Sequence, residues 1–164
     1  MLRSLVAVTL VLGTVTSARA EQAAATPLNY VVASVTTTLV YQPNVGSLQG
    51  PLKDIGPVVG FGRYVTDTVA LELDLGPTFI EGDYASFAFV PGVVWSFSTH
   101  VYAAARLVVP VDPQINVLLF PGVGLIHTFK NQISLTLELN LASAVGRGDP
   151  DLGVTLTPGI VYSF

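Results

Sequence analysis

The charged residues that could do chemistry in this chain stand at alternate positions. Glu72 and Asp74 are two residues apart, as are Glu138 and Asn140, and Arg106 is the one lysine or arginine between positions 64 and 129. Residues two apart share one face of a β-strand, so each pair would point to the same side. A guanidinium stays charged and can form paired hydrogen bonds with carboxylates. We therefore predict that these five residues form one polar network, in which the excess of acid is shared with a proton, a water chain or a cation.

The elements that carry these residues have a period of two. Glu72 and Asp74 stand between leucines, and every second residue from Ile133 to Leu141 is isoleucine or leucine. Between Phe87 and Phe97 the odd positions are again large and apolar or proline. A helix would spread each apolar set around its circumference, whereas a strand places it on one face. The alternation therefore predicts β-strands.

Continuing the alternation predicts eight strands, each near the roughly 9–11 residues of a tilted membrane strand. They are expected at residues 29–41, 55–65, 69–80, 86–97, 101–111, 116–128, 133–145 and 152–164. The connections after the second, fourth and sixth strands are tight, and the others include the longest, an asymmetry typical of outer-membrane barrels. The second, fourth, sixth and eighth strands share a proline that removes a ladder hydrogen bond and predicts a kink or bulge. These prolines are Pro57, Pro91, Pro121 and Pro158.

Composition supports an exported membrane protein. Only 11% of the 164 residues are charged, 51% are hydrophobic, and cysteine is absent. These values exclude a disordered chain and a disulfide or zinc module, and the net charge of −4 argues against nucleic-acid binding. Residues 1–20 combine Arg3, an apolar run and a small-x-small ending at Ala20, as in a signal peptide. We predict cleavage after Ala20, export to the bacterial outer membrane, and one barrel domain at 21–164.

The last residues make the resemblance specific. Ile160, Tyr162 and Phe164 alternate and end the chain on an aromatic residue. With the signal peptide and the eight alternating segments, this resembles the small eight-stranded outer-membrane β-barrels of the OmpA/OmpX type. The resemblance implies an all-β, antiparallel, up-and-down transmembrane barrel with both termini in the periplasm. It also implies that these three residues are the signal read by the barrel-assembly machinery. An interfacial aromatic girdle is expected from Phe61, Trp95, Phe97, Tyr162 and Phe164.

In such a barrel the polar faces point inward. An eight-stranded interior is just wide enough for side chains to fill, so the predicted network would plug the lumen. The expected role is structural or a surface interaction, without a cofactor or metal. A narrow passive channel is the alternative. A secreted lipocalin-like carrier, apolar inside and polar outside, is a weaker alternative that would invert both faces.

We expect no enzymatic activity. Some barrels of this size modify lipid A, and ester hydrolysis would need a nucleophile beside a base and an orienting acid. His100 falls in an expected turn and His127 on an apolar face. The residues after His127 are Thr128 and Phe129, which do not form the His-x-Ser pattern of lipid A deacylases.

Acidic loops suggest the partners. At the end opposite the tight turns, the expected loops carry two basic and six acidic residues, which could bind lipopolysaccharide through divalent cations. They are Lys53, Asp54, Glu81, Asp83, Asp112, Arg147, Asp149 and Asp151. The expected partners are outer-membrane lipid, lipopolysaccharide and the barrel-assembly machinery, and the chain is expected to be a monomer.

Overall fold

All eight expected strands are present. The computed structural model describes residues 28–42, 55–80, 83–111, 117–145 and 152–164. The strands are β1 (Asn29–Gln42), β2 (Ile55–Tyr64), β3 (Val69–Ile80), β4 (Asp83–Ser96), β5 (Val101–Pro110), β6 (Val117–Thr128), β7 (Ile133–Val145) and β8 (Leu152–Ser163). The largest difference from expectation is at β4, which begins at Asp83 rather than at residue 86. The described residues contain no helix long and apolar enough to cross a membrane.

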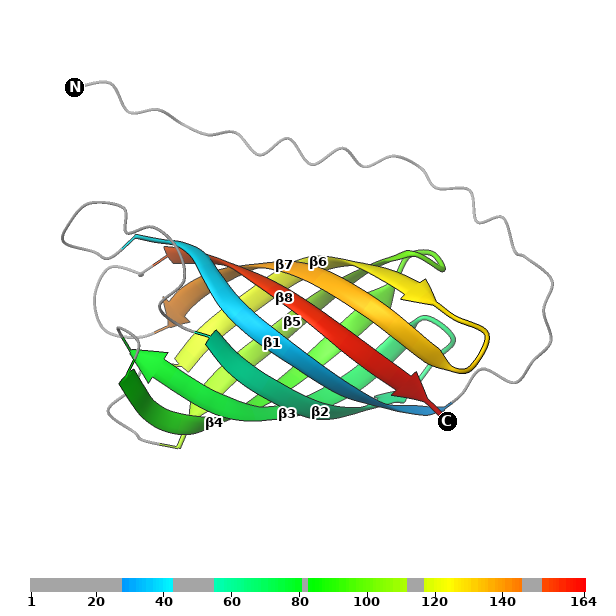
Figure 1. Ribbon diagram of the computed structural model, residues 1–164, viewed down its shortest axis with the longest axis horizontal. Helices are drawn as coiled ribbons and strands as arrows, with labels where there is room; N and C mark the ends of the chain where they lie inside the picture. The colour runs from blue at the N-terminus through cyan, green and yellow to red at the C-terminus, as the bar shows by residue number, and fades with distance from the viewer. Residues whose placement is uncertain (1–27, 43–54, 81–82, 112–116, 146–151) are drawn as a thin grey trace, which may run out of the picture.

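The strands close into one antiparallel barrel in sequence order (Figure 1). β1 pairs with β2 on one side and with β8 on the other, so no sheet edge is left open. Where β1 and β8 meet, Asn29 and Phe164 exchange two backbone hydrogen bonds of 3.2 and 2.8 Å. The predicted fold class, an eight-stranded up-and-down barrel, is confirmed.

Three tight turns and the C-terminus lie at the same end of the barrel, on the right in Figure 1. The turns join β2 to β3, β4 to β5 and β6 to β7, as predicted. In the first two, a hydroxyl accepts a hydrogen bond from the backbone N–H three residues on: Val69 N donates to Thr66 Oγ1 at 3.0 Å, and Val101 N donates to Ser98 Oγ at 3.1 Å. These local bonds favour the reversal of chain direction that sets the register of each hairpin.

The prolines of the even-numbered strands do not shift the register, so the predicted bulges are wrong there, and a kink stays a prediction. Pro91 stays opposite Leu73 on β3, and the register to β5 is the same on both sides of it. The register shifts instead between Thr38 and Val40 and between Thr78 and Phe79. Each proline lacks one N–H and therefore interrupts pairing with one neighbouring strand, while the partner on its other side holds the strand in place.

The two faces of the barrel have opposite character. Leu73 and Leu137 are 47% and 45% exposed on the outside, whereas Glu72 and Glu138 are 7% and 3% exposed. A soluble carrier would bury the leucines and expose the acids. The lipocalin-like alternative is therefore wrong, and the buried polar side chains of the described strands, Glu72 and Glu138 among them, point into the interior.

Candidate functional site

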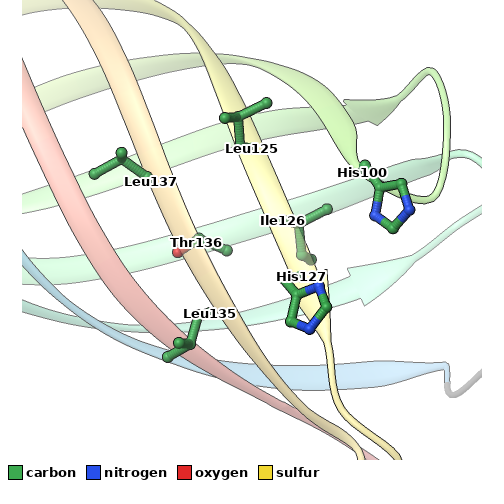
Figure 2. Close-up of a pocket in the computed structure, with 7 residues that line it drawn as sticks. All are labelled: His100, Leu125, Ile126, His127, Leu135, Thr136 and Leu137. Atoms are coloured by element: carbon green, nitrogen blue, oxygen red, sulfur yellow. The ribbon is translucent and has the colours of Figure 1, made fainter.

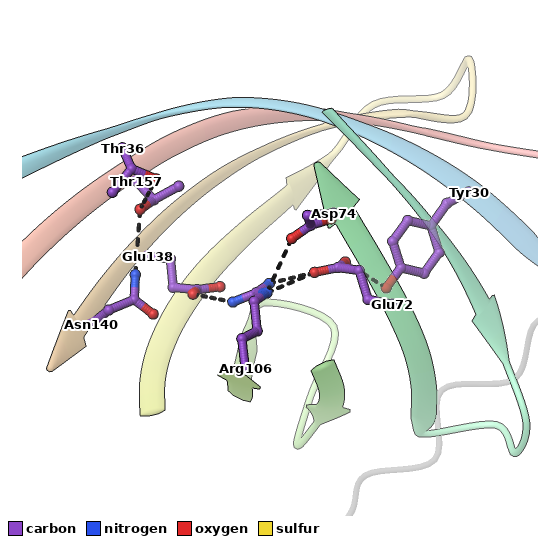
Figure 3. Close-up of polar contacts among 8 residues, drawn as sticks. All are labelled: Tyr30, Thr36, Glu72, Asp74, Arg106, Glu138, Asn140 and Thr157. Atoms are coloured by element: carbon purple, nitrogen blue, oxygen red, sulfur yellow. Dashed lines mark hydrogen bonds and ion pairs between the residues drawn. The ribbon is translucent and has the colours of Figure 1, made fainter. Parts of the chain in front are cut away.

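Arg106 is the centre of the polar network inside the barrel (Figure 3). From β5, its Nε and Nη2 donate to one oxygen of Glu72 on β3, at 2.8 and 2.7 Å. Its Nη1 donates to Glu138 on β7. One guanidinium thus links strands on both sides of its own, and its planar fork suits this geometry because its donors point in fixed, divergent directions.

Asp74 is the third carboxylate of this group, and it is only partly satisfied. Its Oδ2 lies 3.4 Å from Nε of Arg106, whereas its Oδ1 is buried without a hydrogen-bond partner among the described residues. Asp74 itself is 5% exposed. Three carboxylates therefore face one guanidinium, and the network carries a formal excess of negative charge.

Two tyrosines that are not among the five predicted residues extend the network. The hydroxyl of Tyr30 on β1 donates to Oε2 of Glu72 at 2.8 Å, and Tyr102 on β5 lies across Gly124 from Glu138. Both tyrosines are buried. The signal that could have identified them is their even position in an alternating strand, the same parity as Arg106 and Glu72. With them, side chains from β1, β3, β5 and β7 are connected across the lumen.

Asn140 lies beside this group rather than on Arg106. Its Nδ2 donates to Thr157 Oγ1 on β8 at 3.3 Å, and Thr157 shares a 3.2 Å hydrogen bond with Thr36 on β1. Its Oδ1 is buried without a hydrogen-bond partner. The five predicted residues therefore lie in one interior region, where Asn140 belongs to a neutral branch that joins β7, β8 and β1 (Figure 3).

Glycines on the even-numbered strands make room for these large side chains. Gly92 on β4 lies between Glu72 and Arg106 in the two registers, and a Cβ added to it would lie 2.5 Å from Cγ of Arg106. Gly124 on β6 lies between Tyr102 and Glu138, and an added Cβ would lie 2.5 Å from Cε1 of Tyr102. The absence of a side chain at Gly92 and at Gly124 is therefore part of how the network is packed.

The predicted girdle residues all face outward. Phe61, Trp95, Phe97, Tyr162 and Phe164 are each about half exposed. Trp95 packs on Phe97 with ring centroids 4.9 Å apart, and Tyr162 packs on Phe164 at 6.1 Å, close to the turn-bearing end. Ile160 shares the outward face of β8 with Tyr162 and Phe164. The role of these last three residues in assembly stays a prediction.

Other predicted features lie outside the described residues. These are the signal peptide and the acidic loops, apart from Asp83 at the start of β4. Within the described ranges, no three His, Asp or Glu side chains are grouped so that they could hold a metal ion.

Solved structures of small barrels match this architecture. The N-terminal β-barrel domain of Pseudomonas aeruginosa OprF aligns at a TM-score of 0.53 and 13% identity, over 83% of this chain and 99% of that one. Neisserial surface protein A aligns at 0.55 and 12%, over 83% and 97%. Ail, the attachment invasion locus protein of Yersinia pestis, aligns at 0.52 and 11%, over 84% and 99%.

The chain has the fold of a small outer-membrane barrel. No family model matches the sequence, and no curated protein matches it either. At these identities the likeness concerns the fold alone. It agrees with the resemblance drawn from the alternating strands and the aromatic terminus.

Proposed function

We propose that this protein is a non-conducting barrel of the bacterial outer membrane with a structural or surface-interaction role. The observation that carries the proposal is the chain of contacts across the lumen, from Tyr30 through Glu72 and Arg106 to Glu138. Its side chains come from four strands, and its carboxylates are nearly inaccessible to solvent. A small barrel whose interior is filled in this way has no room for an open water path.

Planar-bilayer recordings of the purified full-length protein test the plug. The wild type should show negligible conductance. A variant with Arg106→Ala and Glu138→Ala, which removes the central pair, should show single-channel steps. Val123→Ala changes a lipid-facing residue of β6 and should stay closed, provided that all three proteins show the heat-modifiable gel mobility of a folded barrel. Large, stable steps from the wild type would contradict the proposal.

A narrow cation channel is the second candidate. The excess of carboxylate over guanidinium and the unpartnered Oδ1 of Asp74 favour it, since both would attract a cation. In that case the wild type conducts, prefers cations to anions, and loses this preference in Asp74→Asn. The same recordings therefore separate the two candidates.

The apolar outer surface of the barrel and the aromatic residues at its turn-bearing end support a membrane location. The half-exposed leucines of β3 and β7 would meet hydrocarbon, and the aromatic pairs at the turn-bearing end would lie at its interface. We propose that the turns and both termini lie in the periplasm, because short turns face that side in outer-membrane barrels. Fractionation tests this location, because a membrane barrel needs detergent for extraction and is not released by osmotic shock.

Assembly and partners follow from the same placement. We propose that Ile160, Tyr162 and Phe164 are recognised by the barrel-assembly machinery and that the opposite end contacts lipopolysaccharide. The backbone of Phe164 closes the barrel by pairing with Asn29, so its side chain can be varied without loss of that pairing. Phe164→Ala should slow assembly into liposomes containing the machinery more than it slows spontaneous folding into detergent.

We also propose that the protein acts as a monomer and catalyses no reaction. A change in the mass of lipid A upon expression of the protein would contradict the proposed lack of catalysis.

A further inference from the structure

The two histidines of the chain lie next to one another on the outside of the barrel. His100 ends the turn between β4 and β5, and His127 is on β6. The backbone N–H of Ile126 donates to the carbonyl of His100 at 2.9 Å, which fixes the two positions side by side. Figure 2 shows both imidazoles at the turn-bearing end of a groove on the barrel wall.

The groove combines an apolar length with a polar end. It is shallow and open, with a volume of about 480 Å³, and lies over paired residues of β6 and β7, with Leu135 opposite His127 and Leu125 opposite Leu137. Leu125, Leu135 and Leu137 face outward along it and are each about half exposed. A surface of this kind is complementary to an amphiphile, whose acyl chain would cover the leucines and whose head group would lie between the histidines.

The charge at the polar end favours an anionic head group. Among the described residues, no carboxylate lines the groove, and exposed Lys130 lies in the turn that follows β6. A neutral imidazole still donates one N–H, and a protonated one donates two, so both histidines can bond to a phosphate oxygen. The ring of His127 packs edge-on against Phe129, with centroids 4.9 Å apart at 86°, and this contact orients it.

We propose that this groove binds one phospholipid, with its phosphodiester between His100 and His127 and one acyl chain along the three leucines. The proposal rests on the membrane location and orientation argued above. With the turns in the periplasm, the groove opens to the leaflet of the outer membrane that is made of phospholipid. Other outer-membrane lipid around the barrel would remain less tightly bound.

Titration of the purified full-length protein in detergent tests the site. The ligand is phosphatidylglycerol, and the comparison ligands are diacylglycerol with the same chains and soluble glycerol 3-phosphate. Phosphatidylglycerol should shift the imidazole nitrogen resonances of both histidines and remain bound in native mass spectrometry. Neither comparison ligand should do so, because one lacks the phosphate and the other lacks the chains. Equal shifts with diacylglycerol, equal shifts with glycerol 3-phosphate, or no shifts with phosphatidylglycerol would each overturn the proposal.

Substitution sharpens the test. His100→Leu with His127→Leu should weaken phosphatidylglycerol binding about tenfold or more, since both hydrogen-bond donors to the charged phosphate are lost. Val123→Leu introduces the same side chain on the outward face of β6 outside the groove and should bind as the wild type does. Unchanged binding in the double variant overturns the proposal, and if that variant fails to fold, the resonances of the wild type decide. Lipid binding and conductance are measured separately, so the site can fail while the plugged barrel stands, and the reverse.

Discussion

The inward faces of the odd-numbered and even-numbered strands differ in size and charge. β3, β5 and β7 point Glu72, Arg106 and Glu138 into the lumen, whereas β4 and β6 present Gly92 and Gly124 at the positions opposite them. The two sets could not both consist of large residues, because large side chains from all eight strands would collide in the lumen. At Gly92 and Gly124, the barrel is therefore packed by placing a bulky side chain on one strand against a glycine on the next.

The largest effect is expected from Arg106→Met, which breaks the charged half of the comparison. Removing the guanidinium leaves three buried carboxylates without a cation, and breaking a buried ion pair costs about 3–5 kcal/mol. The free energy of unfolding, measured by urea denaturation in detergent, should fall by that amount. Adding Glu72→Gln and Glu138→Gln to Arg106→Met should restore much of the loss. Absence of this rescue would indicate that shape rather than charge makes Arg106 important.

A charge introduced on the outward face of the barrel should lower the free energy of unfolding slightly less. Leu73→Arg places a guanidinium on the lipid face of β3, one position from the buried Glu72. Near the middle of a bilayer such a change costs about 2–4 kcal/mol. Denaturation in lipid vesicles should show this loss, and Leu73→Ala, which adds no charge, should show less of it. Equal stability of wild type and Leu73→Arg in vesicles would mean that this face does not meet hydrocarbon.

The glycine half of the comparison is tested by Gly124→Ala. The added methyl group would lie 2.5 Å from Cε1 and Oη of Tyr102, so the ring must move, and overpacking of this kind costs about 1–3 kcal/mol. Tyr102→Ala in the same chain should make Gly124→Ala nearly neutral. Val123→Ala, on the outward face of the same strand, serves as the control in urea denaturation. A Gly124→Ala cost that Tyr102→Ala does not change would place the collision elsewhere.

Sequence alone predicted the strands better than the contacts between them. The period of two located all eight strands and indicated which residues face inward. This pattern depends only on the alternation of side chains along each strand itself. Which side chain meets which depends on the register between strands, and turns and barrel closure determine that register. The contact of Tyr30 with Glu72 joins two strands that are not paired to each other, and the position of Gly124 between Tyr102 and Glu138 requires two registers at once. Neither could be obtained from a single strand.

The smallest effect on stability is expected from Asp74→Asn. This variant distinguishes the loosely held carboxylate of Asp74 from the two carboxylates that bond directly to Arg106. Glu72 and Glu138 each accept strong hydrogen bonds from Arg106, whereas Asp74 makes one longer contact of 3.4 Å and leaves an oxygen unpartnered. Neutralising Asp74 removes a repulsion with the neighbouring carboxylates and loses only that weak contact, so the two changes nearly cancel. Unfolding free energy should change by less than about 1 kcal/mol, well below the loss in Glu138→Gln, which weakens a direct bond to the guanidinium. If Asp74→Asn instead destabilises the barrel as much as Glu138→Gln does, Asp74 must hold a cation or water that neutralises the excess charge. The interior would then depend on a bound ion as well as on its own side chains.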